Sequence, residues 1–150
     1  MLTGKPGTGK TTTVAELIVQ AVHRSEKVLA CAPSTTAVDN LLDRLIQSGM
    51  RVVRIGHPAR ITERLRNYSL DGLVEQHENT AVIKDMIREA EMLFRQSEKW
   101  TRAKPQRGAR ESMKREAKRL MGDAKRLERQ AINSILDQAD VICATTTFNP

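Results

Sequence analysis

The chain has 150 residues, the length of one domain at roughly 100–200 residues per domain. Hydrophobic residues make up 39% of it, enough for a thin core and too many for a fully disordered chain. No apolar run approaches the roughly 20 residues that cross a bilayer, and the N-terminus lacks the basic and apolar regions of a secretory signal. We therefore expect neither membrane association nor secretion.

The net charge of +7 is unevenly distributed. Residues 95–130 hold 13 Lys or Arg and 5 Asp or Glu, whereas the other 114 residues hold 12 and 13. A concentrated positive segment favours a polyanionic partner. A solvated helical surface is the alternative, and charge alone does not distinguish the two.

The two cysteines, Cys31 and Cys143, lie inside apolar runs. Two are too few for the disulfide framework of a small secreted protein. We expect two reduced thiols in the core of an intracellular protein, located in the cytoplasm, the nucleus or both.

The first part of the chain alternates between strand and helix patterns. We expect, in chain order, the end of a strand at 1–3, a glycine-rich turn at 4–9, a helix at 11–24, a strand at 28–32, a helix at about 35–48 and a strand at 51–55. The continuous apolarity of 28–32 predicts a strand buried on both faces, as in a parallel sheet. Ser34 is a good N-cap for the helix that follows, and Gly49 is placed to end it.

The second part of the chain is mostly helical. Residues 61–78 show no clear pattern, a long helix is expected from Thr80, and a turn is expected over 101–109. The next helix carries a narrow apolar seam at Met113, Ala117, Leu120, Ala124, Leu127, Ala131 and Ile135. A last strand follows at 140–145. The predicted class is α/β with a parallel sheet, interrupted by an antiparallel helical hairpin inserted at about 61–137.

One motif carries chemistry. Residues 4–11 match G-x-x-x-x-G-K-[ST], the phosphate-binding loop of P-loop NTPases, with a strand end before it and a helix after it. Its glycines let backbone N–H groups approach phosphates, Lys10 supplies a charge for the β- and γ-phosphates, and the Thr11 hydroxyl is a Mg²⁺ ligand. Lys10 and Thr11 are the candidate catalytic residues. The predicted ATP-binding residues are Gly4, Pro6, Gly7, Thr8, Gly9, Lys10, Thr11 and Thr12.

A second acidic element, which hydrolysis needs to hold Mg²⁺ and orient water, is not evident. None of the predicted strands ends in Asp or Glu, and Asp39 and Asp43 have the spacing of a solvated helix face. Only three residues precede the loop, against a usual strand of about five or six. We expect a P-loop core that is incomplete at both ends.

Four blocks carry a resemblance to a known family: residues 4–14, 31–41, 54–60 and 139–147, in that order. Together they resemble the superfamily-one helicases of the nonsense-transcript-regulator branch. The resemblance implies a motor of two RecA-like domains that moves 5′ to 3′ on single-stranded DNA or RNA with ATP. This chain would be part of the first domain, over 1–150, without its second RecA-like domain.

The resemblance also implies contacts with the nucleic-acid strand. Pro33, Ser34 and Thr35 would meet its phosphates, and Thr145 and Thr146 would lie there too. The sequence departs from the family pattern at Lys5, at Thr35 and at 148–150, where Pro, Asn and Gly are usual.

Three functions are compatible with the sequence. The first is the ATP-binding part of a helicase, with weak or no turnover and no unwinding by the isolated chain. The second is a non-catalytic P-loop fragment that binds nucleic acid or a protein partner. The third is a small P-loop kinase whose hairpin is a lid, although the block at 31–41 argues against it.

Overall fold

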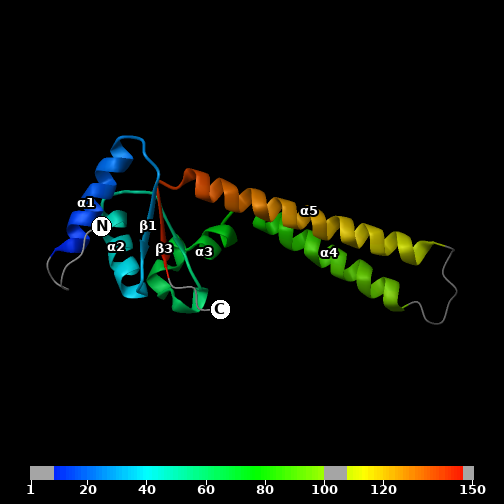
Figure 1. Cartoon of the computed structure of the whole chain (residues 1–150). Helices are drawn as coiled ribbons and strands as arrows, with labels where there is room; N and C mark the ends of the chain where they lie inside the picture. Colours follow the sequence, from blue (N-terminus) through cyan, green and yellow to red (C-terminus); the bar gives the residue numbers. More distant parts are fainter. Residues whose placement is uncertain (1–8, 100–107, 147–150) are drawn as a thin grey trace. The chain divides into compact units, whose positions relative to one another are not determined.

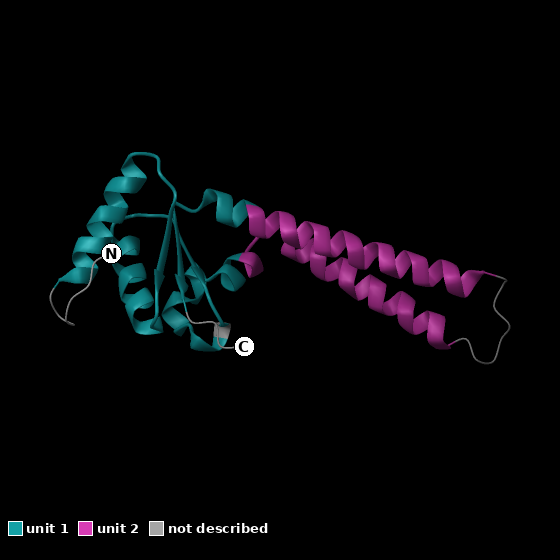
Figure 2. Cartoon of the chain, in the orientation of Figure 1, with its two compact units in different colours: residues 1–73, 134–150 teal, residues 74–133 magenta. Residues whose placement is uncertain are grey.

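The computed structural model describes residues 9–99 and 108–146, and its helices and strands are labelled in Figure 1. The chain divides into two compact units (Figure 2). Residues up to Leu73 and from Ser134 onward form the sheet unit, and Val74–Asn133 form the helical unit. The helical unit lies within residues 61–137, the range expected for the helical hairpin. That this hairpin is an insertion into a RecA-like domain stays a prediction.

The sheet unit is built on three parallel strands. They are β1 (Val28–Ala32), β2 (Val52–Ile55) and β3 (Val141–Thr145), in the order β1-β3-β2. Val141 lies opposite both Val28 and Val52, so the last strand of the chain occupies the centre of the described sheet. The parallel α/β class predicted from the apolar runs is confirmed.

Two helices cover one face of this sheet. They are α1 (Lys10–His23) and α2 (Thr35–Gln47), close to the predicted ranges. Ser34 caps α2 as expected, because its Oγ accepts a hydrogen bond from the backbone N–H of Ala37 at 3.2 Å. Gly49 follows the helix with φ +75°, a left-handed conformation that glycine adopts without strain.

The core lies between these helices and the sheet. Its buried members are Ala15, Ile18, Val38, Leu42, Leu45, Val52, Ile61, Leu65, Val141 and Cys143. Ile61 and Leu65 belong to the stretch without a clear pattern, which folds into η1 (Pro58–Arg60), η2 (Glu63–Tyr68) and α3 (Leu70–Glu75). Elements this short have no sustained periodicity, which explains why the sequence did not predict them.

Strand β1 contradicts two expectations. Leu29 is 67% exposed and Cys31 is exposed, so the strand is not buried on both faces and only Cys143 is a core thiol. The reason is that the described residues cover only one face of this strand. Val28, Ala30 and Ala32 pack against the core, while the alternate side chains point to the opposite face.

The helical unit is an antiparallel pair, α4 (Thr80–Lys99) and α5 (Ala109–Gln138), of which α5 extends beyond the unit (Figures 1 and 2). The predicted seam is confirmed, since Ala117, Leu120, Ala124 and Ala131 are buried. Ala90 of α4 packs in one cluster with Ala117 and Leu120. The expected turn lies mostly outside the described residues. No helix among the described residues is long and apolar enough to span a membrane.

Candidate functional site

The predicted phosphate-binding loop leads directly into α1. Gly9 has φ +76° and Lys10 begins the helix, so the chain turns through a conformation that other residues rarely adopt. The first turn of α1 holds no acidic residue, which leaves the positive end of the helix dipole without a carboxylate from that turn. Gly4, Pro6, Gly7 and Thr8 lie outside the described residues.

A pocket of about 660 Å³ lies where α1 begins beside α2. It is lined by Gly9, Lys10, Thr11, Thr12, Ser34, Thr36, Ala37, Asn40 and Arg44. The structure therefore brings four of the predicted nucleotide-binding residues together with Ser34, which the resemblance places on the strand. Hydroxyls, a lysine and the start of a helix are donors that suit a phosphate.

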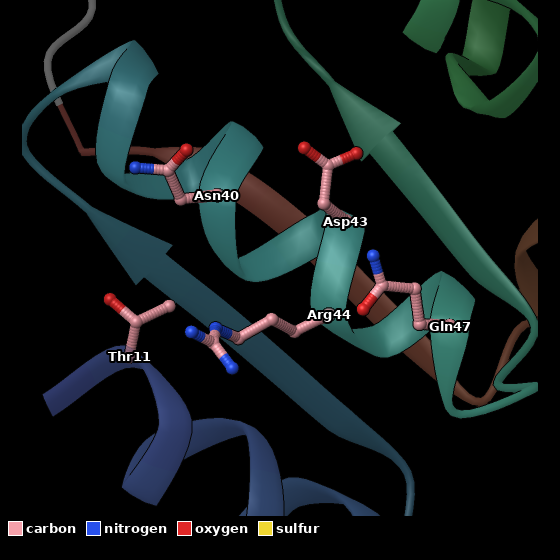
Figure 3. A pocket seen from close by; sticks show the side chains of 5 residues that line it. All are labelled: Thr11, Asn40, Asp43, Arg44 and Gln47. Atoms are coloured by element: carbon pink, nitrogen blue, oxygen red, sulfur yellow. The ribbon is translucent and has the colours of Figure 1, made fainter. Parts of the chain in front are cut away.

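A second hollow, of about 350 Å³, adjoins Thr11 on the side of α2. Figure 3 shows Arg44 extending from α2 toward Thr11. Sequence reasoning missed Arg44 and Asn40. The available signal was their spacing, since Thr36, Asn40 and Arg44 recur every four residues and share one side of the helix.

The residues that the resemblance assigns to the strand lie at the carboxyl edge of the sheet. Thr145 lies opposite Ala32 in the sheet register, and the Thr146 N–H donates to the Ala32 carbonyl at 2.9 Å. The segment that begins at Pro33 therefore starts next to Thr146. Carboxyl edges of parallel sheets are the usual place for ligands in open α/β folds.

Asp39 and Asp43 do not form a solvated face, and that expectation is wrong. Asp39 Oδ1 lies 3.2 Å from Nε of Arg54, whose side chain is only 1% exposed. Asp43 accepts two hydrogen bonds from Arg64, both at 2.7 Å. Side-chain hydrogen bonding to Asp43 raises the pKa of Arg64. Both carboxylates of α2 are thus bound by arginines, and their pairs fix α2 against β2 and η2.

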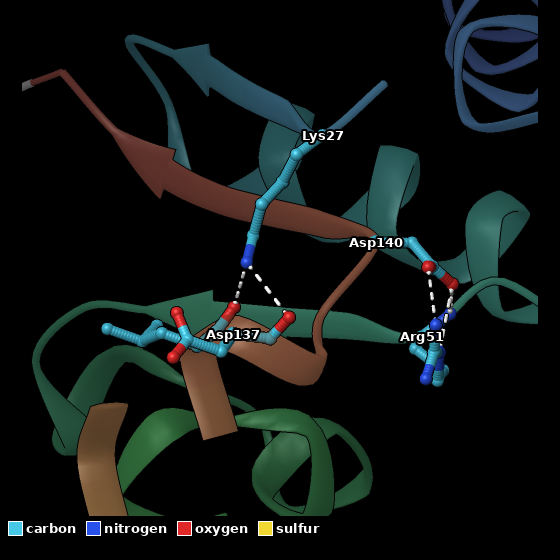
Figure 4. A network of polar contacts seen from close by, with 5 residues as sticks. Lys27, Arg51, Asp137 and Asp140 are labelled. Atoms are coloured by element: carbon cyan, nitrogen blue, oxygen red, sulfur yellow. Dashed lines mark hydrogen bonds and ion pairs between the residues drawn. The ribbon is translucent and has the colours of Figure 1, made fainter. Parts of the chain in front are cut away.

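The opposite, amino edge of the sheet holds a network of polar contacts (Figure 4). Lys27 Nζ donates to the carbonyls of Leu136 and Asp137, at the end of α5. Asp140 accepts from the backbone N–H of Arg51 at 2.9 Å and pairs with its guanidinium at 3.0 Å. These contacts fasten the returning chain to the sheet, on the edge away from the pocket.

Thr11 offers an oxygen donor of the kind that Mg²⁺ prefers. The Thr11 hydroxyl, which lines both hollows, fits the role of a Mg²⁺ ligand beside a nucleotide. Within residues 9–99 and 108–146, no group of three or more His, Cys, Asp or Glu could hold a metal by itself. Burial raises the pKa of Cys143 to about 11, so this thiol stays protonated at neutral pH and is no nucleophile.

A parallel sheet, a glycine turn that opens a helix, and a Lys-Thr-Thr sequence at the start of that helix define the P-loop class of α/β proteins. The match to a family model agrees: residues 1–149 match the AAA_11 family, described as an AAA domain. The chain belongs to this family.

Several relatives carry names that specify the family further. The chain is 43% identical over 144 residues to the DNA-binding protein SMUBP-2 of Mus musculus, covering 96% of this chain and 14% of the relative. It is 33% identical over 181 residues to an uncharacterised ATP-dependent helicase of Methanocaldococcus jannaschii, covering 99% and 27%. It is 32% identical over 161 residues to a regulator of nonsense transcripts 1 homologue of Neurospora crassa, covering 97% and 12%.

These relatives confirm the resemblance to helicases of the nonsense-transcript-regulator branch. The chain spans less than a third of the length of each of them. What the chain shares with these relatives is therefore one region of a longer protein, and the activity of a whole helicase is a separate question.

Proposed function

We propose that this chain is the ATP-binding part of a superfamily-one helicase that moves along single-stranded nucleic acid. The observation that carries the proposal is the pocket in which Lys10, Thr11 and Thr12 meet the first turns of α2. The names of the relatives, which include an ATP-dependent helicase and a DNA-binding protein, support the same activity.

In this proposal the residues of the pocket bind and orient the nucleotide. The backbone N–H groups at the start of α1 donate to phosphate oxygens, and Lys10 contributes a positive charge. Thr11 is the residue whose hydroxyl would hold Mg²⁺. When bound, Mg²⁺ neutralises charge on the β- and γ-phosphates. Of the other predicted residues, Gly4, Pro6, Gly7 and Thr8 would complete the loop around the phosphates.

The strand would lie at the carboxyl edge of the sheet, against Pro33, Ser34, Thr35, Thr145 and Thr146. Hydroxyls and N–H groups contact phosphates without reading the base sequence, as a motor that moves along a strand requires. Ser34 can serve this role while it caps α2, because a hydroxyl that accepts from Ala37 still has a proton to donate. The proposal includes both DNA and RNA.

Turnover by this chain alone is expected to be weak. Asp43 is the acidic residue among the described residues of the two hollows, and its carboxylate is bound to Arg64. It is therefore not placed to activate water. A non-catalytic fragment that binds nucleotide and strand is the second candidate, and this observation favours it. ATP hydrolysis measured with and without a single strand separates the two.

The proposed function is tested first by thermal unfolding of the 150-residue chain with and without Mg-ATP. At a ligand concentration of 100 times Kd, binding stabilises the folded state by about 2.7 kcal/mol, and the melting temperature should rise by several degrees. Lys10→Ala should abolish the rise. Lys125→Ala, which removes an exposed lysine of α5, is the matched control and should retain it. An equal rise in Lys10→Ala, or none in the wild type, contradicts the proposal.

A further inference from the structure

The nucleotide pocket has a second wall, and that wall contains an arginine. Arg44 lines the main pocket with Lys10 and Thr12, and it also lines the adjoining hollow with Thr11. A third hollow, of about 170 Å³, places it beside Thr12 and Glu16. In Figure 3 its guanidinium extends from α2 toward Thr11 rather than along its own helix. The side chain therefore lies beside the start of α1.

The two carboxylates of α2, the helix that carries Arg44, are both paired with other arginines. Asp39 pairs with the buried Arg54 at 3.2 Å, and Asp43 forms two hydrogen bonds with Arg64. Neither carboxylate lines the main pocket, although Asp43 lines the adjoining hollow. No ion pair of Arg44 occurs within the described part of the chain.

The first turn of the facing helix, α1, adds positive charge to the main pocket. The first turn of α1 contains Lys10 and no acidic residue, and its N–H groups form the positive end of the helix dipole. Glu16, further along α1, accepts a hydrogen bond from Gln20 at 3.3 Å and shares the third hollow with Arg44, but it does not line the main pocket. The charged residues among the described lining of the main pocket are Lys10 and Arg44, so the pocket favours an anion.

We infer that Arg44 is a second cationic ligand for the phosphates of the bound nucleotide, contributed by α2. The inference rests on the proposed function, because it concerns the same pocket. A guanidinium offers planar, paired N–H donors, which match the oxygens of a phosphate. Lys10 then binds the phosphates from α1 and Arg44 binds them from α2, and the nucleotide joins the two helices.

The test is the binding of fluorescent mant-ADP and mant-ATP, with Mg²⁺, to the 150-residue chain. Arg44→Gln should raise the Kd of both nucleotides roughly tenfold or more, the effect expected for a lost hydrogen bond to a charged group. Arg44→Lys keeps the charge without the paired donors, so its Kd values should lie between those of the wild type and those of Arg44→Gln. Arg44 is exposed, so all variants should fold, and their melting temperatures without nucleotide should match that of the wild type.

Two comparisons identify the group that Arg44 contacts. Arg24→Gln removes an equal charge from the far end of α1, where Arg24 pairs with Glu26, and should leave the Kd unchanged. Tripolyphosphate has no base or sugar, so its inhibition constant against mant-ADP should rise in Arg44→Gln by a factor similar to that for ADP. An unchanged constant for tripolyphosphate would overturn the inference.

The outcomes also separate this inference from the proposed function. If Lys10→Ala loses binding while Arg44→Gln binds like the wild type, the assignment of Arg44 is wrong and the proposed function stands. If the wild-type chain binds neither nucleotide, both are overturned. If Arg24→Gln weakens binding as much as Arg44→Gln does, the effect comes from overall charge and not from a contact in the pocket.

Discussion

The two units of this chain are stabilised in different ways. The sheet unit buries branched side chains between layers, with Leu42, Leu45 and Leu65 at most 1% exposed. In the helical unit most of the buried positions hold alanine, among them Ala90 and Ala117, both fully buried. Alanine brings two helices close together but removes little apolar surface from water. We therefore expect the helical unit to be the less stable of the two.

The charged residues differ in the same way. In the helical unit, Arg119 pairs with Glu116 and Asp123 on the surface, where ion pairs contribute little to stability. In the sheet unit, the arginine of the Arg54–Asp39 pair is 1% exposed. The surface pairs are easily replaced by water, whereas the buried pair makes each partner dependent on the other.

The largest predicted effect tests this dependence. Asp39→Ala leaves the buried Arg54 charge without its carboxylate and should destabilise the sheet unit by about 3–5 kcal/mol. Asp43→Ala is the matched control, because it lies one turn further along α2 and pairs with an arginine that is 70% exposed. Its effect should be far smaller. Urea unfolding followed by circular dichroism measures both.

A double variant completes that experiment. Arg54→Met with Asp39→Leu replaces the buried pair by apolar side chains and should recover most of the stability lost in Asp39→Ala. Equal losses for Asp39→Ala and Asp43→Ala would show that burial of Arg54 is not what distinguishes the two pairs.

Asp39 and Asp43, which were expected on a solvated helix face, show what the sequence alone can predict and what it cannot. Helices, strands and the parallel sheet followed from apolar spacing, and the phosphate loop followed from its motif, because both signals are local in the chain. The partner of Asp39 lies 15 residues away on another element, and no spacing within α2 identifies it. The spacing of Arg44 shows only that it shares a side of α2 with Thr36 and Asn40, and its place in the pocket depends on how α1 and α2 pack.

The order of the strands in the sheet could not be predicted from the sequence either. The apolar run at 28–32 has the composition of a central strand, but β3 comes from the end of the chain and takes the central place between β1 and β2. Leu29 and Cys31 are exposed because the described residues cover only one face of β1. No property of the run itself determines which strand becomes the edge.

The second prediction concerns the alanine seam. Ala117→Leu adds a large side chain where the two helices touch and should destabilise the helical unit by about 1–3 kcal/mol. Hydrogen exchange should accelerate in α4 and in the part of α5 within this unit, and remain unchanged in β1 to β3. The control, Ala81→Leu, changes an exposed position of α4 and should have little effect. Slower exchange in Ala117→Leu would mean that the seam has room and that the helices are not closely packed.

The third prediction uses two glycines whose surroundings are alike and whose backbones differ. A Cβ added to Gly122 or to Gly49 would meet no atom within 4 Å, but Gly49 has φ +75° while Gly122 lies inside α5. Gly122→Ala should stabilise the helical unit by about 0.5–1 kcal/mol, because alanine loses less entropy in a helix. Gly49→Ala should destabilise the sheet unit, since alanine is strained in that conformation. The same sign for both substitutions in thermal unfolding would contradict the difference in backbone conformation.

The smallest predicted effect is a pH-dependent change in the stability of the sheet unit. A side-chain hydrogen bond from Arg51, assisted by the Arg51 backbone N–H and by charge, lowers the pKa of Asp140 from its ordinary value of 3.8. Because the folded state favours the carboxylate, the contribution to stability is complete above the unfolded pKa and is lost as the pH falls through the folded pKa. Asp140→Asn should therefore be less stable than the wild type at pH 7, and the difference should vanish in acid well below the ordinary value. Asp137→Asn is the control, because the backbone carbonyl of Asp137, and not its carboxylate, is what Lys27 binds. Urea unfolding measured from pH 7 into acid should show a stability difference from the wild type that disappears in acid for Asp140→Asn alone. A difference that persists in acid would mean that Asp140 stabilises the fold by its shape rather than by its charge.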